Sequence, residues 1–135
     1  MVVVAVTDES HVALAQWEAM VLARSAGLSQ VAVYSIATSV SELADNLLFH
    51  TCNGGTITIR TVRQNGRVGV EVVAEDEGPG IVNLELAMQD GFSTNGGLGG
   101  GLPGVKRLMD EFEIESQVGA GTRVVARAWK SMQNV

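Results

Sequence analysis

An acidic residue and two glycines follow a run of β-branched residues in the middle of the chain. Asp76, Gly78 and Gly80 come shortly after residues 68–73, most of which are valine. A carboxylate at the end of a strand can accept a hydrogen bond from an exocyclic amine such as that of adenine, and glycines let a ring approach the backbone. A tight hairpin turn explains the same residues equally well.

A carboxylate and a carboxamide stand four residues apart upstream of this turn. Glu42 and Asn46 fall in a segment with helical periodicity, so they project from neighbouring turns on one side of the expected helix. By helical geometry they lie roughly 110° around from the centre of the apolar stripe, at the edge of the core. In that position Glu42 is suited to act as a general base and Asn46 as an oxygen ligand of Mg²⁺. A solvated helix face is the alternative interpretation of this pair.

A glycine-rich run at residues 96–101 leads into the start of another expected helix. Unpaired N–H groups and the helix dipole at such a start attract anions, so Gly97, Gly99, Gly101 and the adjoining Leu102 are predicted to hold phosphates. The run is neither a GxxxxGK[ST] loop nor a dinucleotide fingerprint, because a long loop rather than a strand precedes it. A glycine-rich linker explains it equally well.

A two-glycine turn at residues 119–121 precedes Thr122 near the C-terminal end of the chain. The Thr122 hydroxyl can face the same pocket as the three groups above. Ordinary hairpin chemistry accounts for this turn just as well.

The apolar pattern predicts the elements that must position these residues. Ser29 is a good cap for a helix that continues to about residue 50, with apolar residues at steps of three and four. The Asn65-Gly66 pair between two β-branched runs predicts an antiparallel hairpin. The other expected elements are a strand over residues 2–6, a helix over 11–26, hairpin strands over 56–62 and 68–74, a helix over 102–112 and strands over 113–118 and 122–129.

A long polar and glycine-rich passage separates the hairpin from the last helix. Residues 81–101 are expected to form a mobile lid with at most one short helix, near residues 84–89. Paired strands and grouped helices together indicate an α+β fold. We expect a two-layer sandwich in which helices cover one face of a mixed, mostly antiparallel sheet.

Composition limits the class of protein further. A chain of 135 residues with 46% hydrophobic and 18% charged residues is expected to form a single domain over residues 1–135. The net charge of −6 argues against nucleic acid as a partner. Cys52 is the only cysteine, which excludes an intramolecular disulfide. The apolar start at residues 1–6 is too short for a membrane span or a signal peptide, so we expect a cytoplasmic protein with no membrane association.

Taken in order, the four groups of residues resemble the nucleotide-binding boxes of the GHKL ATPases. That superfamily includes gyrase, heat-shock chaperone, histidine kinase and mismatch-repair ATPase domains. The resemblance is carried by Glu42-x-x-x-Asn46, Asp76-x-Gly78-x-Gly80, Gly97-x-Gly99-x-Gly101 and Gly119-x-Gly121-Thr122. It extends from the second helix to the last strand.

Within that superfamily the chain is similar to the serine kinases that control bacterial sigma factors by partner switching. Residues 75–81, 90–94 and 101–112 resemble most the stressosome switch serine/threonine kinases of the RsbT type. The Leu-Pro-Gly-Val-Lys-Arg-Leu sequence at residues 102–108 is the most discriminating part. The resemblance implies an ATP-dependent kinase that phosphorylates serine or threonine on STAS-domain scaffold or antagonist proteins of a stressosome. Once released, such a kinase binds and activates a downstream phosphatase or another signalling output protein.

The resemblance also implies a role for each site residue. Glu42 would activate the acceptor hydroxyl, Asn46 would hold Mg²⁺ and Asp76 would read adenine of ATP or ADP. Gly78, Gly80 and Thr122 would complete the adenine pocket, and Gly97, Gly99, Gly101 and Leu102 would surround the phosphates. Residues 83–96 would be the lid.

Two further expectations concern partners. A nucleotide-dependent binding module that sequesters a sigma factor stays open as an alternative, and so does a homodimer. Related kinases present arginines on the first helix to their partners. Here the expected outer positions of that helix include Gln16 and Met20, with Arg24 as the main cation.

Overall fold

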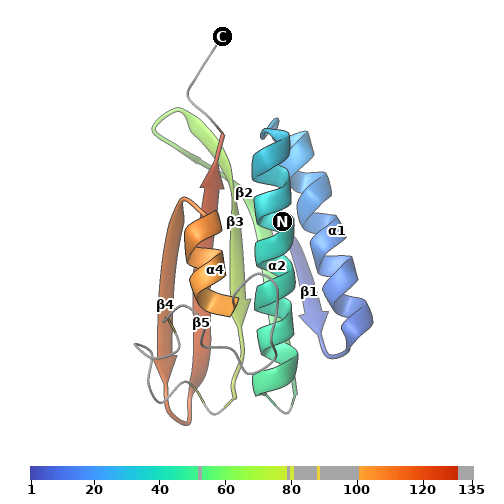
Figure 1. The fold of residues 1–135 in the computed structure, drawn as a ribbon, viewed down its shortest axis with the longest axis vertical. Coiled ribbons are helices and arrows are strands. Elements are labelled where there is room, and N and C mark those ends of the chain that lie inside the picture. The colour runs from blue at the N-terminus through green and yellow to red at the C-terminus, as the bar shows by residue number, and fades with distance from the viewer. Residues whose placement is uncertain (52, 79, 81–87, 89–100, 131–135) are drawn as a thin grey trace.

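The computed structural model describes residues 1–51, 53–78, 80, 88 and 101–130. Within these residues, three helices lie on one face of a five-stranded sheet (Figure 1). The strands are β1 (Val2–Val6), β2 (Gly55–Gln64), β3 (Arg67–Glu75), β4 (Glu111–Gln117) and β5 (Gly121–Trp129). The helices are α1 (Glu9–Ser25), α2 (Gln30–His50) and α4 (Gly101–Leu108).

The strands follow the spatial order β1-β2-β3-β5-β4, with β3 in the centre. Each of the four neighbouring pairs is antiparallel, so the sheet contains no parallel pair within the described residues and is simpler than the mixed sheet expected. The predicted α+β sandwich with helices on one face is confirmed. No helix in the described part of the chain is long and apolar enough to span a membrane.

Side-chain caps fix where the two long helices begin. Asp8 accepts a hydrogen bond from the Ser10 N–H at 2.8 Å at the start of α1. Ser29 accepts one from the Ala32 N–H at 3.1 Å at the start of α2, as predicted. These oxygens satisfy N–H groups that have no partner inside the helix. Between the helices, Gly27 turns the chain with a φ of +83°, in the left-handed region that favours glycine.

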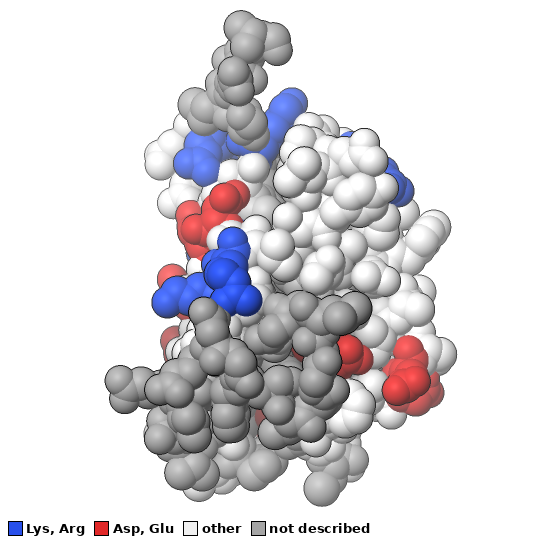
Figure 2. All heavy atoms as spheres, viewed as in Figure 1, with Lys and Arg blue, Asp and Glu red and all other residues white. Residues whose placement is uncertain are grey.

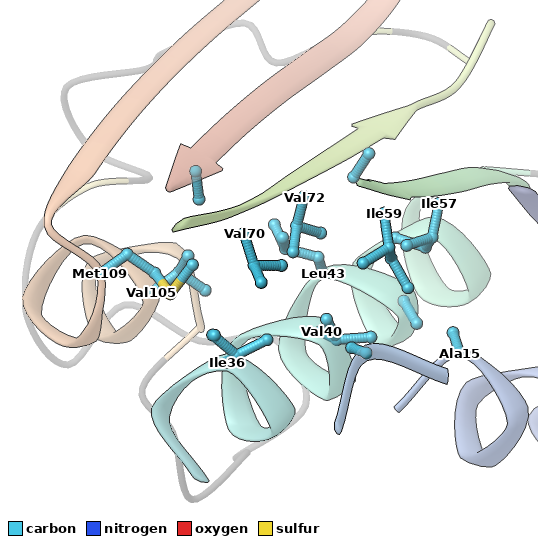
Figure 3. Packing of buried hydrophobic residues seen from close by; sticks show 14 of the residues in the cluster. Ala15, Ile36, Val40, Leu43, Ile57, Ile59, Val70, Val72, Val105 and Met109 are labelled. Atoms are coloured by element: carbon cyan, nitrogen blue, oxygen red, sulfur yellow. The ribbon is translucent and has the colours of Figure 1, made fainter. Parts of the chain in front are cut away.

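The core lies between the helices and the sheet (Figure 3). Alternate residues of β3 point toward α2, where the predicted apolar stripe is buried. Figure 3 shows Val70 and Val72 of β3 facing Ile36 and Leu43 of α2, with Val105 of α4 closing the side of the cluster. Burial of this stripe sets the rotation of α2 and therefore the direction in which its polar residues point.

The hairpin between β2 and β3 lies at the opposite end of β3 from Asp76. Its two turn residues, Asn65 and Gly66, have φ values of 53° and 78°. Positive φ at both central residues is typical of the tight turn predicted from the Asn-Gly pair. The predicted antiparallel hairpin is confirmed, and its register pairs Arg60 with Glu71.

The helix expected over residues 102–112 is wrong at its C-terminal end. Helix α4 ends at Leu108, which is 39% exposed, and Phe112 lies in β4 opposite Ala126. Two bonds to β5 fix the start of the strand: the Asp110 N–H donates to the Arg127 carbonyl at 2.9 Å, and the Asp110 carboxylate accepts from the Trp129 N–H at 2.7 Å. Pairing with β5 therefore overrides the helical spacing.

The outward orientation expected for Gln16 and Met20 on the first helix is also wrong. The buried stripe of α1 consists of alanines at steps of four, Ala15, Ala19 and Ala23. Gln16 follows this stripe by one residue, and its side-chain amide donates to the Ala37 carbonyl of α2 at 3.1 Å. The Met20 side chain is partly buried and packs against the core. The exposed side of α1 instead carries three large apolar side chains, Leu14, Trp17 and Val21, together with Arg24.

Candidate functional site

Glu42 and Asn46 lie on successive turns of α2, beside the buried stripe. The Glu42 residue is only 8% exposed and Asn46 is half-buried. Burial raises the pKa of the neighbouring Asp45 carboxyl, and the negative charges of Glu42 and Glu9 raise it further. Several carboxylates therefore share this part of the molecule, and their shared negative charge favours a bound cation there.

The Asp76 carboxylate is held in place by the backbone around it. Asp76 follows the last residue of β3, and its N–H donates to the Thr122 carbonyl on β5 at 3.0 Å. The Gly78 N–H donates to Oδ1 of Asp76 at 2.8 Å. This local bond between a side chain and the backbone two residues later stabilises a turn. The two bonds fix both the position and the orientation of the carboxylate.

Two glycines allow the turn after Asp76 to pack backbone against backbone on neighbouring segments. Gly80 has a φ of +79°, and a Cβ there would come within 2.4 Å of the Gln117 carbonyl oxygen. Gly121 has a φ of +100°, and a Cβ there would lie 2.1 Å from the Asp76 carbonyl oxygen. Real Cβ atoms do not come this close to a backbone oxygen. Residues 76–78 and Gly80 therefore form one unit with the β4–β5 turn.

The Thr122 hydroxyl, predicted to face the pocket, lies 2.8 Å from the Ser116 hydroxyl of β4. Its backbone carbonyl accepts the hydrogen bond from Asp76 described above. The structure therefore places Thr122 directly beside Asp76, with a backbone contact that the sequence did not suggest.

Thr51 connects the end of α2 to this unit and was missed from the sequence. Its hydroxyl lies 2.6 Å from the Leu47 carbonyl oxygen and 2.9 Å from that of Gly54, to which it donates. Its methyl group packs against Gly78, where an added Cβ would come within 2.8 Å of Cγ2. Thr51 is five residues after Asn46, so it ties the helix that carries Glu42 and Asn46 to the turn that carries Asp76.

The glycine run before α4 is described only at its end. Gly97 and Gly99 lie outside the described residues, as do the expected short helix over 84–89 and the expected lid over 83–96, except for Met88. Gly101 has a φ of +65° and opens α4, and a Cβ added to it would meet no atom within 4 Å. The Leu102 side chain is buried in the core, so its contribution to a ligand would come from its backbone N–H.

The structure thus brings four of the predicted residues together at one end of the sheet. Asp76, Gly78, Gly80 and Thr122 are joined by the contacts above, and Thr51 connects them to α2. Helix α4 packs against α2 on the same side of the sheet (Figure 1). Among the described residues no group of three His, Cys, Asp or Glu side chains is placed to hold a metal ion. A metal here would depend on one or two protein ligands and on oxygens of a second ligand.

Comparison with known proteins gives relatives for almost the whole chain. The family model described as "Histidine kinase-like ATPase domain" matches residues 4–128. The serine/threonine-protein kinase RsbT of Bacillus subtilis is 47% identical over 108 residues, which are 80% of each protein. An anti-sigma F factor of Caldanaerobacter subterraneus is 38% identical over 97 residues, 68% of this chain and 66% of that protein. These relatives confirm the family resemblance stated from the sequence.

A solved structure supports the same fold. The mycobacterial sensor histidine kinase MprB matches with a TM-score of 0.54 and 22% sequence identity, covering 74% of each chain. At that identity the match concerns the arrangement of helices and strands.

Proposed function

The chain belongs to the histidine kinase-like ATPase domain family, and from that membership we propose that residues 1–135 act as an ATP-dependent protein-serine/threonine kinase. Its substrates are STAS-domain scaffold or antagonist proteins of a bacterial stressosome. After release from them, it binds and activates a downstream phosphatase or another signalling output protein in the cytoplasm. The similarity to the kinase RsbT over 80% of both chains supports this proposal.

The single observation that carries the nucleotide site is the fixed position of the Asp76 carboxylate. Its backbone N–H is bound to β5, and its Oδ1 is bound to Gly78. An acceptor held in this way can distinguish an adenine amino group from a carbonyl oxygen without first losing conformational freedom. The N–H groups at the start of α4, beginning at Gly101, supply donors for phosphate oxygens.

Glu42 and Asn46 supply the catalytic groups in this proposal. The γ-phosphoryl group passes from ATP to the substrate hydroxyl: a new P–O bond forms, the bond to the ADP oxygen breaks, and Glu42 accepts the hydroxyl proton. Asn46 fits as a ligand of Mg²⁺, because an amide oxygen one helical turn from the buried Glu42 carboxylate suits a hard cation. Magnesium, when bound, neutralises charge on the phosphates.

The role of Glu42 is testable by a substitution that keeps its shape. Glu42→Gln removes the basic oxygen, so phosphoryl transfer to STAS proteins should fall by about 10²- to 10⁴-fold while ATP still binds. The measurement is incubation with labelled ATP, Mg²⁺ and the STAS proteins encoded beside this chain, with ATP affinity measured separately. Glu113→Gln, at an exposed position on β4, is the matched control and should transfer at the wild-type rate. Undiminished transfer by Glu42→Gln would remove Glu42 from this role.

A second candidate function is supported by the similarity to anti-sigma F factors. In this case nucleotide acts as a conformational ligand and the chain sequesters a sigma factor. The same labelling experiment separates the two functions. Absence of label on every STAS protein, together with a stoichiometric nucleotide-dependent complex with a sigma factor, would favour sequestration over kinase activity.

A further inference from the structure

A groove of about 500 Å³ runs between the first half of α2 and the end of α4. Its lining differs in chemistry from the candidate nucleotide site, since most of its surface is apolar and the lining includes the cation Arg107. The residues that matter here are Val31, Tyr34, Ser35 and Thr38 of α2, and Arg107 and Leu108 of α4.

The groove lies on the same face of α2 as the proposed catalytic base. Val31, Ser35, Thr38 and Glu42 follow one another at steps of four, three and four, the spacing of residues along one side of a helix. Thr38 and Glu42 are separated by about one turn, a rise of about 6 Å. A polypeptide segment lying in the groove would therefore lead directly to Glu42.

The exposed side chains at the groove favour a protein segment as its occupant. Val31 is 77% exposed, Tyr34 50% and Leu108 39%, so three large apolar side chains gather at one place on the surface. Clusters of this kind mark interaction sites more often than scattered single residues do.

The basic residues beside the groove indicate which side chains a docked segment would carry. The chain carries a net charge of −6, yet the last turn of α4 presents Lys106 and Arg107, both exposed. Figure 2 shows blue Lys and Arg atoms in the region of α4, beside an uncharged surface in the region of α2. A local positive charge next to apolar side chains attracts a partner that combines acidic and apolar residues.

We propose that the groove between α2 and α4 docks the segment of the protein substrate that carries the acceptor serine or threonine, through apolar side chains and an acidic one. This inference rests on the proposed kinase function and adds the surface that selects the substrate. The groove holds the segment, and Glu42, one turn further along α2, accepts the proton of the acceptor hydroxyl.

Direct binding tests the groove separately from catalysis. We would measure the affinity of the full chain for the STAS proteins encoded beside it, with a non-hydrolysable ATP analogue and Mg²⁺ present. Val31→Glu and Arg107→Glu should each weaken binding about tenfold or more, as expected for central contacts of an interface. Affinity for the ATP analogue should stay at the wild-type value, which also shows that the variants are folded.

Matched controls change the same residue types elsewhere. Val3→Glu alters an exposed valine of β1, and Arg63→Glu reverses an exposed charge near the β2–β3 hairpin. Both should bind the STAS protein as the wild type does. Wild-type affinity and KM in the two groove variants, alongside normal phosphorylation, would overturn the docking inference and leave the kinase function standing. If the wild-type chain neither binds nor phosphorylates any STAS protein, both proposals fail.

Cross-linking identifies the occupant. A photo-reactive amino acid in place of Tyr34 should form its cross-link to the substrate peptide that contains the phosphorylated residue, while the same amino acid in place of Arg63 should not. A cross-link to a distant surface of the substrate, or to a second copy of this chain, would overturn the assignment of the groove to the acceptor segment.

Discussion

The close approach of Gly121 to Asp76 links the β4–β5 turn to the candidate adenine site. A Cβ on residue 121 would lie 2.1 Å from the Asp76 carbonyl oxygen, whereas a Cβ on residue 119 would meet nothing within 4 Å. Both glycines have positive φ, +100° and +84°. Comparing substitutions at Gly119 and Gly121 therefore separates the cost of backbone strain from the cost of displacing Asp76.

We expect Gly121→Ala to lower both stability and ATP affinity, and Gly119→Ala to lower stability alone. An alanine with positive φ costs about 1–2 kcal/mol, which applies to both variants. In Gly121→Ala the methyl group must also push Asp76 away, so ATP affinity should fall at least about tenfold, or about 1.4 kcal/mol. Urea unfolding and ATP titration provide the two measurements. Equal ATP affinities in the two variants would contradict a role for the Asp76 position in nucleotide binding.

At the level of single residues, the structure gives some of the predicted site residues contacts that the sequence did not suggest. Gly78 and Gly80 are predicted from the room that glycine leaves for a ligand, but Gly80 also makes room for the Gln117 carbonyl. Thr51 could not be found, because its importance depends on contact with Gly78, which is distant along the chain. Local patterns indicate which residues have special chemistry, whereas contacts between distant segments decide how those residues are held.

Among the elements, the boundary between α4 and β4 shows where local patterns fail. Val105, Leu108, Met109 and Phe112 follow a helical spacing, yet Phe112 is a strand residue that packs against the core beside the exposed Glu113. Over such a short segment the helical and strand periods overlap, so periodicity alone cannot separate them. The hydrogen bonds to β5 decide the outcome, and they connect residues 17 or more positions apart.

A ladder of charged side chains crosses the sheet face opposite the helices. Glu71 of β3 is 4% exposed and lies between Arg60 of β2, at 2.6 Å, and Arg127 of β5, at 2.8 Å. Arg127 continues the ladder to Glu111 of β4 at 2.9 Å. Burial alone would raise the pKa of Glu71, but the hydrogen bonds and charges of the two arginines outweigh it and lower the pKa below its ordinary value of 4.5.

Glu71→Gln should therefore destabilise the sheet in a pH-dependent way. At pH 7 the loss should be about 1–3 kcal/mol, because Arg60 and Arg127 both lose the charge of Glu71, and Arg127 keeps only Glu111. A carboxyl with a lowered pKa in the folded state contributes its full stabilisation above its unfolded pKa. The difference between wild type and variant should thus be constant above about pH 5 and shrink as the pH falls below 4.5 through the lowered value.

Urea unfolding at a series of pH values checks this expectation. Glu113→Gln is the control, because Glu113 is an exposed residue two positions after Glu111 on the same strand. Its effect at pH 7 should be small. A stability difference for Glu71→Gln that is independent of pH between 7 and 3 would show that the charge of Glu71 does not stabilise the sheet.

At the scale of the whole molecule, the candidate nucleotide site and the β2–β3 hairpin lie at opposite ends of β3. A substitution near the hairpin therefore serves as a control in a test of ligand binding. The Asp76 end of β3 carries the candidate nucleotide site, and the β2–β3 hairpin with Arg63 lies at the other end (Figure 1). A ligand that binds only the folded chain stabilises it by about 2.7 kcal/mol at 100 times its Kd. For a domain of this size the Tm should rise by about 5–10 °C when ATP and Mg²⁺ are added at that concentration.

Asp76→Asn should remove this rise in Tm while leaving the ligand-free Tm nearly unchanged. Asparagine keeps the oxygen that accepts the Gly78 N–H, but it can present a donor instead of a second acceptor to the adenine amino group. GTP should give the wild-type chain a smaller rise than ATP, because guanine carries a carbonyl oxygen where adenine carries the amine. Arg63→Gln, at the far end, should show the full ATP response. Equal rises with ATP and GTP in the wild-type chain would contradict Asp76 as the residue that reads the base.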